Sequence, residues 1–192
     1  AAAAARAGAS VRVIAANIDE SVMAALPSGV EVTRVGSACE MREATMAQVI
    51  GADALVMTAA VADFRPEAAQ ASKMKKDPTK TDAPTLRLVR NPDILSEVGH
   101  SDIRPALVVG FAAETGTDEE ILANGADKAA RKGADYIALN RVGAGVGFGD
   151  VPNDIRLLDV GGQIVGRYIG SKDEVAAGLV AQMAAFLDNL ER

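Results

Sequence analysis

The stretch Ala54-Leu-Val-Met-Thr-Ala-Ala60 decides the fold. Thr58 is its one polar residue, and an apolar run of this length is typical of a strand that is buried on both faces, as in a parallel sheet. A second run of the same kind, Ala106–Ala112 (ALVVGFA), lies further along the chain. Together the two runs predict that the chain folds around buried parallel strands.

The segments around these runs alternate between strand-like and helix-like patterns. Further strands are expected at 11–15, 30–35, 136–140, 155–160 and 164–169, the last two as a hairpin on Gly161-Gly162. Helices that each begin with a capping box are expected at 37–50, 117–132 and 171–190. This alternation predicts an α/β, Rossmann-like, doubly wound and mainly parallel sheet, with helices on both faces and a C-terminal antiparallel hairpin.

The composition fits one globular domain over residues 1–192, with 49% apolar and 24% charged residues and a net charge of −6. The acidic balance argues against general nucleic-acid binding, and no apolar run reaches the roughly 18 residues of a membrane helix. Cys39 and His100 are the only cysteine and histidine. Their scarcity excludes an intrachain disulfide, argues against a His/Cys metal site and suits the cytoplasm.

Candidate binding residues follow the predicted strands, because the loops after the carboxyl ends of parallel strands form the ligand crevice. The small residues before Asp63 let a ligand approach the backbone, and Asp63 then lies at the mouth, although a turn acid has the same pattern. The cluster Lys73-Met-Lys-Lys76 follows in a long loop. These lysines either neutralise a polyphosphate or belong to a solvated loop.

Three further features are compatible with both a structural and a binding role. Lys128 and Lys132 share one helix face, where they complete a phosphate clamp or interact with the helix dipole. The run Asn91-Pro92-Asp93 predicts a helix with Asn91 as N-cap and Pro92 as first residue, whose amides can also bind an anion. Phe111 ends a buried strand, where it packs in the core or against a base.

Several nucleotide-binding and catalytic templates are absent from the sequence. There is no P-loop, no G-x-G-x-x-G between a strand and a helix, and no G-x-S-x-G elbow. Cys39 lies inside a capping box, which favours a packing role over a nucleophilic one.

The motifs that remain occur together in one known family. The series AAVADFRP (59–66), KMKK (73–76), VRNPDIL (89–95), GFAAET (110–115), the Lys128/Lys132 pair, DYIALN (135–140) and FGDVPN (148–153) resembles phosphopantothenate–cysteine ligase of the bacterial CTP-dependent type. The resemblance covers nearly the whole chain in order, with Phe64 where Tyr is common and Met74 where Ile is common. In bacteria this coenzyme A biosynthesis enzyme is often fused behind a flavin-dependent decarboxylase.

The resemblance implies a ligase that uses CTP to activate 4'-phosphopantothenate as an acyl-cytidylate, releases pyrophosphate and joins the acyl group to L-cysteine. It implies Lys73 and Asp63 as catalytic residues, with Asp63 at the nucleotide or its Mg²⁺ (or Mn²⁺). Its implied nucleotide-binding residues are Met57, Thr58, Ala59, Asp63, Lys73, Arg90, Asn91, Pro92, Asp93, Phe111, Lys128 and Lys132. FMN is expected only on a fused decarboxylase domain.

The family pattern also implies a homodimer and a longer domain. The family begins with a strand, a Gly-rich loop of GGTxEP type and an N-x-SSG segment, none of which occurs here, and the alanine-rich start matches the end of the family's first helix. The domain is therefore expected to lack its first strand and Gly-rich loop. The alternatives are an NAD(P)-dependent oxidoreductase on a similar fold and a non-catalytic nucleotide-binding or dimerisation module.

Overall fold

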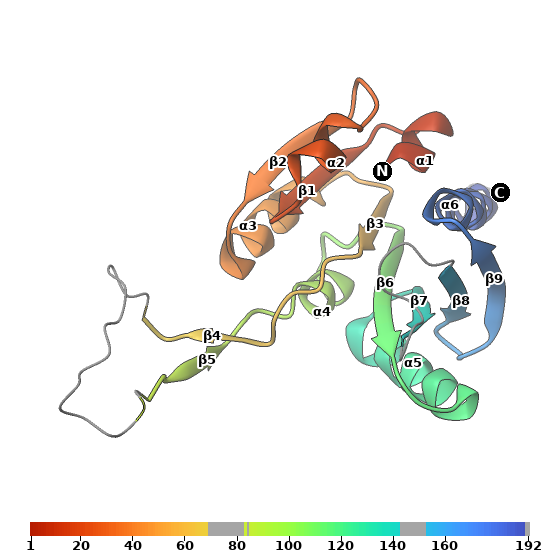
Figure 1. The fold of residues 1–192 in the computed structure, drawn as a ribbon. Helices are drawn as coiled ribbons and strands as arrows, with labels where there is room; N and C mark the ends of the chain where they lie inside the picture. Colours follow the sequence, from red (N-terminus) through yellow and green to blue (C-terminus); the bar gives the residue numbers. More distant parts are fainter. Residues whose placement is uncertain (69–82, 84, 143–152, 191–192) are drawn as a thin grey trace.

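The computed structural model describes residues 1–68, 83, 85–142 and 153–190 (Figure 1). In chain order the elements are α1 (Ala2–Arg6), β1 (Arg12–Ala16), α2 (Glu20–Ala24), β2 (Glu31–Val35), α3 (Ala38–Gln48), β3 (Ala54–Met57), β4 (Phe64–Pro66), β5 (Leu88–Arg90), α4 (Ile94–Gly99), β6 (Leu107–Glu114), α5 (Asp118–Lys132), β7 (Tyr136–Arg141), β8 (Asn153–Asp159), β9 (Ile164–Gly170) and α6 (Lys172–Leu190). Within these residues, no helix combines the length and the apolar character needed to cross a membrane.

The centre of the molecule is a five-stranded sheet in the order β3-β6-β7-β8-β9. The pairs β3–β6 and β6–β7 are parallel, whereas β7–β8 and β8–β9 are antiparallel. The predicted α/β sheet with its C-terminal antiparallel hairpin is therefore confirmed. The hairpin turns at the two predicted glycines, of which Gly162 has a φ of +77°.

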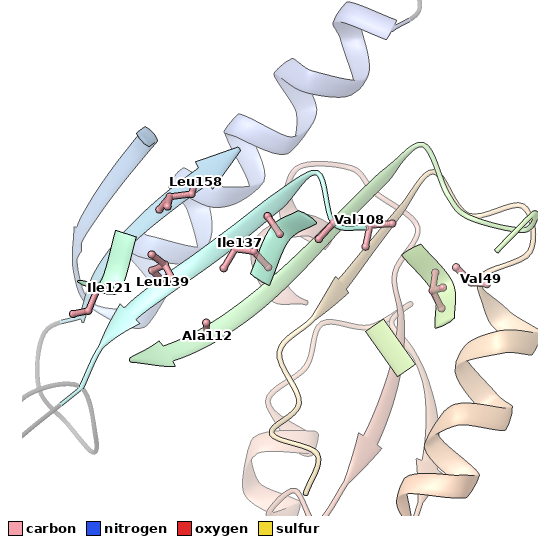
Figure 2. Close-up of a cluster of buried hydrophobic side chains, with 10 residues drawn as sticks. Val49, Val108, Ala112, Ile121, Ile137, Leu139 and Leu158 are labelled. Carbon is pink, nitrogen blue, oxygen red and sulfur yellow. The ribbon is translucent and has the colours of Figure 1, made fainter. Parts of the chain in front are cut away.

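One face of this sheet carries the larger hydrophobic core (Figure 2). Ile137 and Leu139 of β7 point to this face and pack with Ile121 of α5 and Leu158 of β8. Helix α5 approaches β7 closely at Gly125, where a Cβ atom would lie only 2.7 Å from the Leu139 side chain. A glycine at this point therefore sets how near the helix lies to the sheet.

The opposite face is covered by α6. Tyr136 and Leu157 point to this side and pack with Val175 and Leu179 of α6. The ring of Phe186 completes the contact edge-on to Tyr136, with the ring centroids 5.4 Å apart. Helices on both faces explain why β6 has hardly any polar positions. The prediction that the run at 54–60 is a strand buried on both faces is wrong: β3 covers only Ala54–Met57 and is only partly buried.

The N-terminal elements form a separate two-stranded parallel sheet, β1–β2, which α3 connects to the rest. Arg42 of α3 makes a 2.6 Å salt bridge with Glu97 of α4, and Val49 packs with Val98 and Val108. Among the described residues, β1 pairs only with β2, and β3 pairs only with β6. Each of these two parallel strands therefore has one unpaired edge.

The predicted helix starts are confirmed at all three capping boxes. The side-chain oxygens of Ser37, Thr117 and Ser171 accept hydrogen bonds from the amides of the glutamates three residues later, at 3.2–3.3 Å. Helix α5 ends at Gly133 in the left-handed conformation, as its glycine predicts.

The predicted start of the helix after β5 is wrong by two residues. Asp93, not Asn91, is the N-cap of α4, and its carboxylate accepts a hydrogen bond from the Ser96 amide at 3.2 Å. The reason is that the Asn91 side chain is already used: its Nδ2 donates to the carbonyl oxygen of Ala62 at 2.8 Å. An asparagine held by another segment cannot also cap the helix.

Candidate functional site

The carboxyl edge of the sheet begins where β3 ends at Met57. Met57 lies beside Gly110 of β6 in the parallel register, and Thr58 and Ala59 continue beyond the sheet as exposed residues. The chain then runs to Asp63, whose carboxylate is exposed, and enters β4. The predicted residues of this segment therefore lie at the ligand-binding edge of an α/β sheet.

Asn91 joins this segment to the one that follows β5. Its main-chain amide donates to the carbonyl oxygen of Asp63 at 2.8 Å, and its side chain donates to Ala62. Arg65 adds two bonds across the same gap, to the Arg90 carbonyl oxygen at 2.7 Å and to the Asn91 Oδ1 at 3.1 Å. The motifs AAVADFRP and VRNPDIL are about thirty residues apart in the sequence, and the structure joins them by hydrogen bonds.

The two predicted lysines of α5 are each paired with a carboxylate, Lys128 at the end of β6 and Lys132 at the start of α4. Lys132 donates to Asp93, and Lys128 lies 3.3 Å from the Glu114 carboxylate at the end of β6. Lys128, Lys132 and Glu114 are at most 29% exposed in their side chains. The lysines therefore form a semi-buried pair of cations whose charges are compensated within the chain.

The pKa of Asp93 reflects this pairing. Burial acts to raise the pKa, but the hydrogen bond from Lys132 and the amide of Ser96 together hold it below the ordinary value of an aspartate. Asp93 is therefore ionised at neutral pH, and its charge is available to hold Lys132 in place.

Phe111 lies on the other face of the sheet. It is partly buried and packs on the core cluster beneath α6, whereas Lys128 and Lys132 come from α5. Among the predicted nucleotide-binding residues, the structure thus joins Asp63 to Asn91 and Asp93 to Lys132, while the carbonyl oxygen of Arg90 accepts from Arg65. It places Phe111 across the sheet from the lysines.

Glu114 and Arg65 belong to this edge although the sequence did not assign them a role. Glu114 lies in the motif GFAAET and Arg65 in AAVADFRP, so membership of these motifs could have indicated a role for both. Their partners are distant in sequence, and spacing alone does not reveal such pairs. Lys73 and the rest of 69–82, and residues 143–152, lie outside the described residues.

A protein-only metal centre is not formed by the described part of the chain, where no group of three or more His, Cys, Asp or Glu side chains comes together. Magnesium in nucleotide sites commonly uses one or two carboxylates and completes its shell with phosphate oxygens and water. The exposed carboxylate of Asp63 suits that more limited role.

The sequence of residues 1–187 matches the protein family described as DNA/pantothenate metabolism flavoprotein C-terminal domain, or DFP. The chain belongs to the DFP family. It is 38% identical over 186 residues to the coenzyme A biosynthesis bifunctional protein CoaBC of Mycolicibacterium smegmatis, covering 94% of this chain and 44% of that protein. It is 42% identical over 163 residues to CoaBC of Vibrio parahaemolyticus, covering 84% and 39%. The chain therefore spans less than half the length of these curated relatives.

Solved structures agree with the DFP assignment at the level of the fold. The crystal structure of the C-terminal domain of CoaBC superimposes with a TM-score of 0.73 at 24% identity, covering 98% of this chain and 80% of that one. A Cab2 mutant in complex with phosphopantothenate-cysteine has a TM-score of 0.59 at 12% identity, covering 84% and 54%. At these identities the likeness confirms the α/β architecture.

Proposed function

We propose that this DFP-family chain is the nucleotide-binding part of a phosphopantothenate–cysteine ligase of coenzyme A biosynthesis. The observations that carry the proposal are two contacts between separate motifs: Asn91 donates to the carbonyl oxygen of Asp63, and Lys132 pairs with Asp93, two residues after Asn91. These residues come from separate motifs of the ligase pattern. A nucleotide site requires residues of separate motifs to lie close together, and these two contacts support that expectation.

In the proposed reaction, a carboxylate oxygen of 4'-phosphopantothenate attacks the α-phosphorus of CTP. The bond between the α-phosphorus and the bridging oxygen to the β-phosphorus breaks, and pyrophosphate leaves with that oxygen. The amine of L-cysteine then attacks the acyl carbon of the acyl-cytidylate and loses a proton. The bond from that carbon to the phosphate oxygen breaks, and CMP leaves with the amide formed.

The chain's own contribution to these steps is positioning and charge compensation. We assign phosphate binding to Lys128 and Lys132, which exchange their partners Glu114 and Asp93 for phosphate oxygens. Lys73 is assigned to the triphosphate, and Met57 to Ala59 to the cytidine. Mg²⁺ or Mn²⁺, held by Asp63 and the phosphates, would supply further charge neutralisation.

The decisive experiment uses a protein that carries this chain together with the strand and Gly-rich loop proposed below. It is incubated with CTP, Mg²⁺, phosphopantothenate and cysteine, and pyrophosphate is measured. We expect CTP-dependent release that needs phosphopantothenate, and loss of most of this activity in Lys132→Gln. The matched control is Arg131→Gln, which removes a neighbouring cation that pairs with Asp127 at 2.6 Å instead of with Asp93. Absence of pyrophosphate release with CTP, ATP and UTP alike would refute the ligase assignment.

We also propose that the functional unit contains a parallel strand between β1 and β3, followed by a Gly-rich loop. Support comes from the unpaired edges of β1 and β3 and from Val56 of β3, which is 42% exposed. One parallel strand in this position would join both sheets into one. Amide hydrogen exchange on a protein that carries such a segment tests this: we expect slow exchange along β1 and β3, and fast exchange would contradict it.

The homodimer is proposed on the β4–β5 ribbon, which extends away from the rest of the molecule (Figure 1). Phe64, Pro66 and Leu88 share one face of it, and Phe64 and Leu88 are 54% and 55% exposed. A two-stranded ribbon is only marginally stable alone. We therefore expect the ribbon of a second copy of the chain to pack against this apolar face. We expect Phe64→Glu to convert a dimer into a monomer in light scattering, whereas an unchanged mass would exclude this interface.

A further inference from the structure

A row of charged side chains crosses β7, β8 and β9 on the α5 face of the sheet. Asp118, the first residue of α5, lies 3.2 Å from Arg141 at the end of β7 and 2.8 Å from Arg156 on β8. Arg167 of β9 donates to both carboxylate oxygens of Asp154. The row contains three arginines and two aspartates, so two of the arginines share one carboxylate.

Arg141 is the more loosely held of the two arginines on Asp118. Its ion pair in the described part of the chain has a distance of 3.2 Å and its side chain is 55% exposed, whereas Arg156 is 15% exposed and lies closer to Asp118. The pKa of Asp118 is lowered, chiefly by the hydrogen bond from Arg156, and the charge of Arg141 has a smaller effect. Asp118 therefore keeps a cationic partner if Arg141 moves away.

Glu114 lies next to Arg141 on the neighbouring strand. The two are register partners in the parallel pair β6–β7, and the Val142 amide donates to the Glu114 carbonyl oxygen at 3.0 Å. Register partners project to the same face of strands that are about 4.8 Å apart, so the Arg141 side chain reaches the Glu114 carboxylate without main-chain movement. In this structure Glu114 is instead paired with Lys128, at 3.3 Å.

The proposed function removes this partner of Glu114. Lys128 exchanges Glu114 for a phosphate oxygen, and the Glu114 side chain is only 21% exposed. A semi-buried carboxylate without a cation costs free energy, and it also competes with the phosphates for the lysine. A second cation that moves onto Glu114 removes both effects, and Arg141 is the register neighbour of that carboxylate.

We propose that Arg141 is a positioning residue that leaves Asp118 and binds Glu114 when the nucleotide binds. Lys128 is thereby released from Glu114 and holds the phosphates, while Asp118 keeps Arg156. Every charged side chain of this exchange has a partner both before and after it. The inference rests on the proposed phosphate-binding role of Lys128 and adds the ion-pair exchange that frees this lysine.

The test measures CTP affinity by calorimetry on a protein that carries this chain with the strand and Gly-rich loop proposed above. We expect Arg141→Gln to bind CTP about fivefold more weakly, because Glu114 then retains Lys128. In a Glu114→Gln background the same substitution should change the affinity by less than about twofold, since the competing carboxylate is gone. Arg141→Lys keeps the charge and should restore the affinity. The matched control is Arg167→Gln on the same face, whose arginine pairs with Asp154 and whose loss should leave CTP binding unchanged.

The outcomes separate this inference from the function on which it rests. If the unmodified protein binds no CTP, or if Lys128→Gln binds it equally well, the phosphate-binding role is refuted and the exchange with it. If Lys128→Gln weakens binding but Arg141→Gln does not, the exchange alone is refuted.

An equal loss for Arg141→Gln with and without Glu114 also refutes the exchange, because Arg141 then acts on the nucleotide directly. Should Arg141→Gln fail to fold, a crystal structure of the unmodified protein with CTP decides. The Arg141 guanidinium must then lie on Glu114, and a guanidinium that is still on Asp118 overturns the proposal.

Discussion

Gly99 ends α4 at its contact with the end of α5, and we expect Gly99→Ala to force these helices apart. A Cβ atom at position 99 would lie 2.1 Å from the carbonyl oxygen of Lys132 and 2.8 Å from that of Gly133. Both obstacles are main-chain atoms, so no side-chain rotation relieves the clash. Because ordinary contact begins at 3.4 Å, α4 must retreat by more than 1 Å.

The expected loss of unfolding free energy depends on the core contacts that α4 makes next to Gly99. Val98, next to Gly99, is completely buried and packs with Val49 and Val108 in the larger core. Overpacking of this kind costs about 1–3 kcal/mol of unfolding free energy, and main-chain obstacles place this site near the upper value. For a chain of this size we expect the melting temperature to fall by roughly 6–10 °C.

Thermal unfolding followed by circular dichroism measures this change. The matched control is Gly36→Ala, where a Cβ atom would meet only the end of the Glu40 side chain, at 3.4 Å. The control should stay within about 2 °C of the unmodified chain. If Gly99→Ala melts together with this control, the close approach of α4 and α5 is not a constraint, and the reasoning is wrong.

Three further substitutions test the cap, the ion pair and the core. Asp93→Asn keeps a good N-cap but loses the charge. Because the pKa of Asp93 is lowered in the fold, we expect the variant to lose about 0.5–1 kcal/mol of unfolding free energy at pH 7, and this loss should disappear as the pH falls below about 4. Urea unfolding at both pH values measures the difference. Thr117→Ala should cost about 1 kcal/mol by the same measurement, since its oxygen caps α5. Ile137→Ala should cost about 2–5 kcal/mol, because Ile137 is fully buried; a cost below 1 kcal/mol would contradict the packing in Figure 2.

The sequence predicted an element well where the signal depends only on residues that are close together in the chain. The run at 54–60 does form a strand, but it is shorter and less buried than predicted: β3 spans Ala54–Met57, and Val56 is 42% exposed. The capping boxes at Ser37 and Thr117 depend on residues three apart, so nothing distant alters them. The start of α4 was mispredicted because Asn91 has a tertiary partner, Ala62, that no local pattern contains.

The candidate site was harder to predict because its geometry depends on long-range pairing. Motif resemblance assigned Asp93 and Lys132 to one site, but only the fold reveals that they bind each other across the α4–α5 contact. Asn140 and Asn153 end two of the quoted motifs, DYIALN and FGDVPN, but the motifs give no sign that a buried side-chain atom of each lacks a partner among the described residues. These atoms become visible only when the β7–β8 register places both residues on one face.

The mixed sheet also has a consequence for the order of folding. Strands β7, β8 and β9 are consecutive and antiparallel, so their pairing closes comparatively short loops, whereas β3 must find β6 across a much longer segment. The hairpin half can form its contacts early, and the parallel half adds to it later. Destabilising changes in β8 or β9 should therefore slow folding, while those in β3 should mainly speed unfolding, and stopped-flow chevrons would separate the two.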